Sequence, residues 1–136
     1  METTNQSKTL NIILWIAQVI LAGMFIMAGF MKTTMPIEQL SVSLPWAKDV
    51  PAWLVRIIGI SEFLGALGLI LPSLLRIKPI LTPLAALGII AIMAMAAVFH
   101  ITRTEISGVV FTFILALVAV FIGWGRWKKV PIQVKS

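Results

Sequence analysis

Four long apolar runs divide the chain, at residues 10–31, 53–71, 83–101 and 106–124. Each run has 19 to 22 residues, and a helix of that length spans about 30 Å, the thickness of the hydrocarbon core of a bilayer. The composition, 60% hydrophobic and 12% charged, is far from that of a soluble domain. We therefore predict an all-α polytopic membrane protein, in which residues 1–136 form one membrane domain built as a bundle of four transmembrane helices.

Prolines mark the predicted ends of the helices. Thr82 followed by Pro83 is a favourable N-cap and first-turn pair for the third helix, and Pro72 is expected to end the second. Residues 33–51, which connect the first two helices, are too many for a tight turn and are partly apolar. We expect a short interfacial helix near residues 36–43 in this segment, lying over the mouth of the bundle.

Basic residues are distributed unequally over the two sides of the predicted bundle. The side that holds both termini and the second connector carries seven, namely Lys8, Arg76, Lys78, Arg126, Lys128, Lys129 and Lys135. The other side carries four, namely Lys32, Lys48, Arg56 and Arg103. This bias predicts a multi-pass protein of the cell membrane with both termini in the cytoplasm. The net charge of +6 is then a signal for orientation and lipid headgroups, and no nucleic-acid partner is expected. The first run is longer than the core of a signal peptide, so we expect it to be retained.

One acidic residue lies inside an apolar run. Glu62, in the stretch IGISEFLGALGLILP at residues 58–72, is predicted about 15 Å below the outer end of the second helix. A charged side chain near the midplane costs about 2.5 to 3.5 kcal/mol, so Glu62 should face the interior of the bundle. Arg56, six positions earlier, is a partner for it if a water molecule or a second helix bridges the two side chains.

Three further polar side chains are expected at the same end of the bundle. Lys32 ends the first helix, His100 ends the third, and Arg103 lies in the third connector. We therefore hypothesise a ligand-binding site in the outer half of the bundle, formed by Lys32, Arg56, Glu62, His100 and Arg103. A structural role stays open, in which Glu62 and Arg56 fix the helix register and Lys32 extends to the headgroups. No catalytic residue and no metal site follows from the sequence.

Small residues recur at spacings that let membrane helices approach closely. The predicted helix-packing positions are Gly29, Gly59, Gly65, Gly68, Gly108 and Gly123.

Three segments carry a resemblance to a known family: AGFMK at residues 28–32, the stretch at residues 58–72 quoted above, and AAVFH at residues 96–100. Together they resemble the DoxX-like family of small four-helix membrane proteins, over roughly residues 12–125. The matching positions are Gly29, Lys32, Gly59, Glu62, Gly65, Gly68 and His100. The resemblance implies a membrane component of oxidoreductase systems, typified by a subunit of thiosulfate:quinone oxidoreductase.

The residues themselves limit the redox chemistry that the chain can perform. Without cysteine and with one histidine, it cannot build an iron–sulfur cluster or a bis-histidine haem site. We expect no intrinsic cofactor, and a quinone is the ligand that best suits an apolar site with a few polar groups. The chain is then a membrane subunit or accessory of a quinone-linked oxidoreductase system. If it takes part in catalysis, we expect it to do so as a subunit of that oxidoreductase. The expected partners are membrane lipids, a soluble or membrane oxidoreductase, and a second copy of the chain. Two alternatives stay open: a proton-coupled small-molecule transporter, and a non-catalytic membrane anchor or assembly factor.

Overall fold

The computed structural model describes residues 2–135, and the side chains of residues 7–135. Five α-helices follow one another within these residues: α1 (Glu2–Thr34), α2 (Ile37–Ser43), α3 (Ala52–Leu75), α4 (Leu81–Thr102) and α5 (Ile106–Trp124). A 3-10 turn, η1 (Pro45–Lys48), follows α2, and a π-helical turn, η2 (Gly125–Lys129), extends α5. Four of the described helices, α1, α3, α4 and α5, are long and apolar enough to cross a membrane. The predicted all-α class with four transmembrane helices is confirmed.

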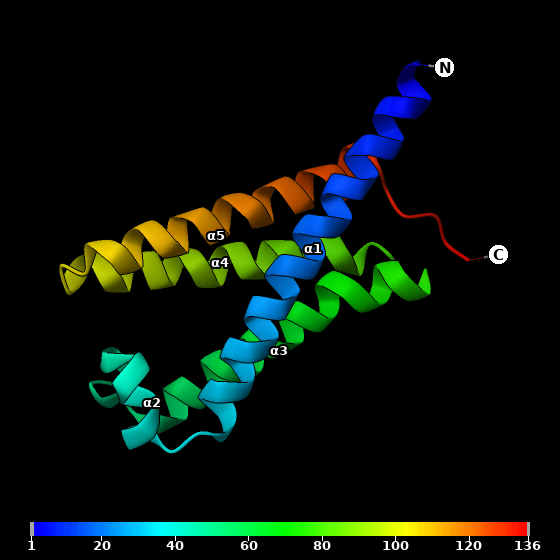
Figure 1. Ribbon diagram of the computed structural model, residues 1–136. Coiled ribbons are helices and arrows are strands. Elements are labelled where there is room, and N and C mark those ends of the chain that lie inside the picture. The colour runs from blue at the N-terminus through cyan, green and yellow to red at the C-terminus, as the bar shows by residue number, and fades with distance from the viewer. Residues whose placement is uncertain (1, 136) are drawn as a thin grey trace.

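The long helices are arranged as two pairs. Helix α1 packs mainly on α3, α4 packs mainly on α5, and contacts between α3 and α4 join the pairs (Figure 1). Both chain ends lie at one end of the molecule, and α2 lies at the other (Figure 1). The shared core is made of small and medium apolar side chains, among them Leu21, Phe25, Ala66, Leu69, Ala86, Ile89, Ala119 and Ile122. Many other large apolar side chains are exposed, as expected of surfaces that face lipid.

The segment between α1 and α3 contains the predicted short helix. Helix α2 occupies Ile37–Ser43, close to the expected residues 36–43. Leu40 and Ala47 are fully buried, and together with Val55 of α3 they form a second apolar cluster. This cluster holds α2 and η1 against the N-terminal part of α3, at the end of the molecule opposite the termini (Figure 1).

The predicted roles of Pro72 and Thr82 are wrong. Helix α3 continues through Pro72 to Leu75, and α4 begins at Leu81, with Ile80 rather than Thr82 at the N-cap. Proline has no N–H, so the carbonyl of Gly68, four residues before Pro72, loses its helical donor. The Thr82 hydroxyl lies 3.1 Å from this oxygen and donates to it. In an apolar environment a freed carbonyl needs such a donor, and a neighbouring helix supplies it here.

Two of the predicted packing glycines lie where α1 crosses α3. A Cβ atom added at Gly29 would lie 2.6 Å from the carbonyl oxygen of Gly59, and one added at Gly59 would lie 2.7 Å from the Cβ of Lys32. Only glycine fits such a close approach of two backbones.

The other packing glycines differ in how tightly they are enclosed. An added Cβ would lie 2.7 Å from Ala85 Cβ at Gly68, 3.1 Å from an Ile89 side-chain atom at Gly65, and 2.6 Å from the His100 ring at Gly108. At Gly123 the nearest atom is 3.5 Å away, an ordinary contact. Among the predicted packing glycines, an added Cβ would therefore be most crowded at Gly29, Gly59, Gly68 and Gly108.

Candidate functional site

An ion pair joins α1 to α3 beside the glycine crossing. The Lys32 ammonium donates to both carboxylate oxygens of Glu62, at 2.8 and 2.9 Å. Both residues are buried, Lys32 at 9% exposure and Glu62 at 3%. The backbones approach closely at Gly29 and Gly59, so the lysine stem reaches the acid one turn deeper in the neighbouring helix. Lys32 thus turns into the bundle instead of extending to the headgroups.

Arg56 and Glu62 both contact α1 at Lys32, Glu62 through the lysine side chain and Arg56 through the lysine carbonyl, so a second helix lies between them as the sequence required. The Nη1 atom of Arg56 donates to the backbone carbonyls of Lys32 and Met35, at 2.9 and 2.7 Å. These carbonyls belong to the C-terminal end of α1, where the last carbonyl groups of a helix have no intrahelical N–H donor and a cation is favourable. Arg56 therefore caps α1 and fixes the backbone from which Lys32 extends.

A cavity of about 470 Å³ opens beside the ion pair. Its polar lining comes from Lys32, Glu62, His100, Ser61 and Thr112, with the amphipathic ring of Trp46 beside them. The rest of the wall is apolar and comes from several helices, including Met24, Phe25, Met93, Phe99, Phe111 and Leu115. Three of the five predicted site residues, Lys32, Glu62 and His100, thus line one cavity, whereas Arg56 and Arg103 do not.

Arg103 lies in a network of charges at the α4–α5 turn. Its guanidinium pairs with Asp49 at 2.8 Å and also with Glu105, whose second oxygen is 2.8 Å from the His100 Nδ1. The hydrogen bond from Arg103, and then the one from His100, lower the pKa of the Glu105 carboxyl below its usual value. The same network raises the pKa of Arg103, chiefly through its hydrogen bond to Glu105. The network positions the His100 ring at the cavity wall. Through Asp49 it also connects the loop after η1 to the α4–α5 turn.

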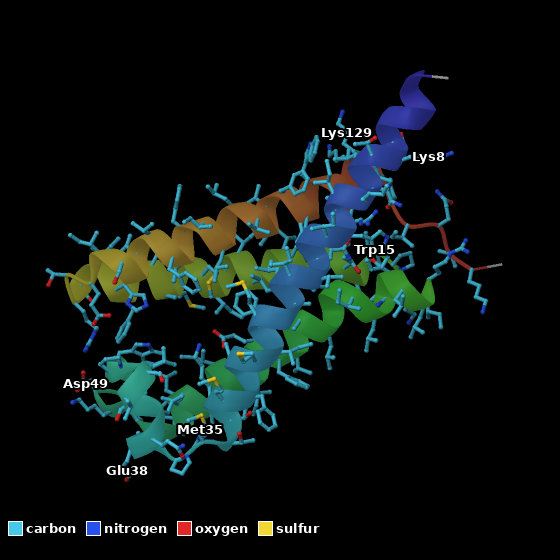
Figure 2. All side chains as sticks on the ribbon, in the orientation of Figure 1. Lys8, Trp15, Met35, Glu38, Asp49 and Lys129 are labelled. Atoms are coloured by element: carbon cyan, nitrogen blue, oxygen red, sulfur yellow. The ribbon has the colours of Figure 1, made fainter. Side chains whose placement is uncertain are left out.

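Two residues of this site were not found by sequence reasoning. Trp46 has its ring 5.7 Å from the Lys32 ammonium and in edge contact with Phe99. Asp49 is the acid that pairs with Arg103. Figure 2 shows Asp49 at the same end of the molecule as α2. The only sequence signal for either was its place in the long connector over the bundle mouth.

The arrangement defines what the site can do chemically. An ammonium, a carboxylate and an imidazole can donate and accept hydrogen bonds at one wall of an otherwise apolar space, which suits an apolar molecule with a polar head. No group of three or more metal-ligating side chains occurs among the residues that the structure describes.

Comparison with known proteins gave one match. A model of the DoxX-like family matches residues 16–122 of the chain, a range that includes every residue lining the cavity. No curated protein and no solved structure showed a significant match.

Proposed function

The chain belongs to the DoxX-like family of integral membrane proteins, and we propose that it is a membrane subunit or accessory of a quinone-linked oxidoreductase system that binds a quinone beside Lys32 and Glu62. The observation that carries the proposal is the position of this buried ion pair at the wall of an apolar cavity. Burial of the two charges costs desolvation free energy, and the position of the pair at the cavity wall leaves the Lys32 ammonium accessible to a ligand.

The size and lining of the cavity suit a quinone head. Pockets for small molecules range from about 300 to 1,000 Å³ and combine apolar walls with a few polar groups; this one has about 470 Å³. A quinone carbonyl accepts hydrogen bonds, and the Lys32 ammonium is a donor at the wall. The isoprenoid tail would leave between apolar helix surfaces toward lipid.

The electrons must come from a partner. Reduction of a quinone to a quinol takes up two electrons and two protons, and a chain without cysteine has no thiol or cluster to carry electrons. Under this proposal a soluble or membrane oxidoreductase supplies the electrons, while Glu62 and His100 are the groups at the cavity wall that exchange protons.

The proposal includes an orientation in the cell membrane. Seven of the basic residues belong to the side of the termini and four to the other, which supports cytoplasmic termini and a cavity in the outer half of the bundle.

The proposal is tested by titrating the purified protein with a short-chain quinone. Calorimetry should detect saturable binding, and the quinone should quench the fluorescence of Trp46, which lines the cavity. The change Glu62→Gln keeps the shape of the side chain but removes its charge and releases Lys32. Because the Glu62 carboxylate holds the Lys32 ammonium at the cavity wall, its loss should displace that donor and weaken binding about tenfold, the equivalent of one charge-assisted hydrogen bond.

Two further variants make the test specific. Glu38→Gln, an exposed position on α2 outside the cavity, makes the same chemical change and should bind as the unaltered protein does. Ala96→Phe, at the cavity wall, leaves the ion pair in place and should block binding by filling the space. Absence of saturable binding in the folded, unaltered protein would refute the quinone proposal and favour the anchor or transporter alternatives.

A further inference from the structure

The surroundings of His100, at the wall of the cavity beside Lys32 and Glu62, fix which of its ring nitrogens carries a hydrogen. The Nδ1 atom lies 2.8 Å from a carboxylate oxygen of Glu105. Hydrogen bonds from Arg103 and then from His100 lower the pKa of the Glu105 carboxyl, so it is ionised at neutral pH. An ionised carboxylate only accepts hydrogen bonds. The Nδ1 atom therefore bears a hydrogen and donates it to Glu105, whether the ring is neutral or charged.

The other ring nitrogen of His100, Nε2, is open to a ligand. It forms no hydrogen bond within residues 7–135. In the same residues, the fully buried side-chain nitrogens and oxygens without a partner include the Nη2 of Arg126 but not this atom, so Nε2 is not enclosed. The Nδ1 side of the ring packs against Gly108 of α5, where an added Cβ would lie 2.6 Å from Nδ1. Because His100 lines the cavity, Nε2 is the ring nitrogen that a ligand can reach, and in the neutral ring it is an acceptor.

The hydrogen-bonding groups at the cavity wall treat the two redox forms of a quinone differently. The Lys32 ammonium can donate to a carbonyl oxygen or to a hydroxyl oxygen, so it serves both forms. The Glu62 carboxylate and the neutral His100 ring accept, and only a ligand with hydroxyl groups can donate to them. The hydroxyls of Ser61 and Thr112 already donate to carbonyls of their own helices, each at 2.9 Å. The acceptors at the wall thus distinguish a quinol from a quinone.

We infer that the cavity prefers the reduced, dihydroxy form of its ligand, a quinol, because a quinol hydroxyl can donate to the Nε2 atom of His100. Glu105 is then a positioning residue, since it keeps the hydrogen on Nδ1 and leaves Nε2 as an acceptor. A quinone would displace water from Nε2 without replacing its hydrogen bond, and this loss lowers affinity. The inference rests on the proposed function, because it assigns the redox form that the same cavity favours.

The preference should depend on the charge of the ring. Imidazole is the side chain that ordinarily changes charge between pH 5 and 8. A protonated ring bears hydrogens on both nitrogens, so its Nε2 becomes a donor and suits a quinone carbonyl. The charged groups around the ring and at the same cavity wall are Glu105, Arg103, Asp49, Lys32 and Glu62. The preference for the quinol should therefore be present at high pH and be lost as the pH falls and the ring gains its second hydrogen.

The test compares one short-chain quinone with the quinol obtained by its reduction, in oxygen-free buffer and with the purified full chain. At about pH 8, calorimetry should give an affinity about three- to tenfold higher for the quinol, the range of one net hydrogen bond. At about pH 5.5 the two affinities should converge or reverse, as expected for a protonated imidazole. Binding of both forms with a ratio that does not change with pH would overturn the inference and leave the proposed function standing. Absence of binding by either form would refute both.

A variant tests the role of Glu105. Glu105→Gln keeps the size of the side chain, but an amide can also donate to Nδ1, so the hydrogen of the neutral ring is no longer confined to that atom. The affinity ratio at about pH 8 should fall at least twofold and vary less with pH, whereas a general structural defect would weaken both forms equally. Glu38→Gln, the same change on exposed α2 outside the cavity, should keep the full ratio. An unchanged ratio in Glu105→Gln would contradict the positioning role, and the pH series on the unaltered protein decides the preference even if this variant does not fold.

Discussion

Lys32 and Glu62 illustrate what a charged residue requires in a membrane-spanning helix. Glu62 is 3% exposed, and its two oxygens accept from one ammonium group. In the pair, each charge compensates the other within an apolar environment, whereas either residue alone would leave a buried charge without a partner. Arg56 serves a different purpose, because its guanidinium satisfies two carbonyls at the end of α1.

The ion pair predicts strongly coupled effects on stability. Lys32→Met should destabilise the protein by about 3 kcal/mol, because it leaves Glu62 buried without a partner. Adding Glu62→Gln should recover much of this loss, since an apolar and a neutral polar side chain then replace the two charges. The measurement is thermal unfolding in detergent, with Lys48→Met at an exposed position as the control. Additive effects of the two changes would contradict the coupling.

At the scale of elements, the crossing of α1 and α3 decides where side chains from the two helices meet. The backbone contact at Gly29 and Gly59 sets the register that places Lys32 beside Glu62. The path of α3 also depends on its neighbours, because Thr82 of α4 and Gln18 of α1 donate to the carbonyls of Gly68 and Leu69 near Pro72. The helix therefore continues past a proline that would otherwise end it.

The crossing predicts opposite effects for two identical substitutions. Gly59→Ala would place a methyl group 2.7 Å from the Cβ of Lys32 and force the helices apart, at a cost of about 1 to 3 kcal/mol. Gly23→Ala, also within a long helix, meets no atom within 4 Å and should raise stability by up to about 1 kcal/mol through helix propensity. Thermal unfolding of both variants measures the difference. Equal midpoints would show that the crossing tolerates a side chain.

At the scale of the whole molecule, two buried polar clusters occupy opposite ends of one bundle. The ion pair and its cavity lie near α2, because Lys32 is close to the C-terminal end of α1 and η1 contributes Trp46 to the cavity. Arg126 belongs to η2 and donates to Gln18 and Asn11 in the first half of α1, toward the chain ends (Figure 1). Four spans place both termini on one side of the membrane, so the ion pair and Arg126 lie toward different leaflets.

The proposed orientation predicts which positions an impermeant thiol reagent can reach in intact cells. The chain has no cysteine, so each introduced cysteine is unique. Ser7→Cys and Gln133→Cys should be protected until the cells are permeabilised, and Ser43→Cys on exposed α2 should be labelled at once. The reverse pattern would show that the termini lie outside.

Local features of the sequence were sufficient to predict where the helices lie. Apolar length and backbone hydrogen bonding within each segment define a membrane helix, so the four spans and α2 were predicted close to their observed positions. The predicted end at Pro72 was wrong, because the donor to the freed Gly68 carbonyl, the Thr82 hydroxyl, comes from another helix. The predicted N-cap at Thr82 was wrong because α4 begins one residue earlier, at Leu81.

The sequence by itself also determined that Glu62 must face inward, since lipid cannot solvate a carboxylate. Only the tertiary structure decided which cation meets it, because the partner depends on the register between α1 and α3 and not on distance along the chain. The tertiary structure also decided the environment of Arg126, which the sequence analysis used only as one of the basic residues that predict membrane orientation. Its burial beside Gln18 and Asn11, residues more than a hundred positions earlier, follows from how the ends of α1 and α5 pack together.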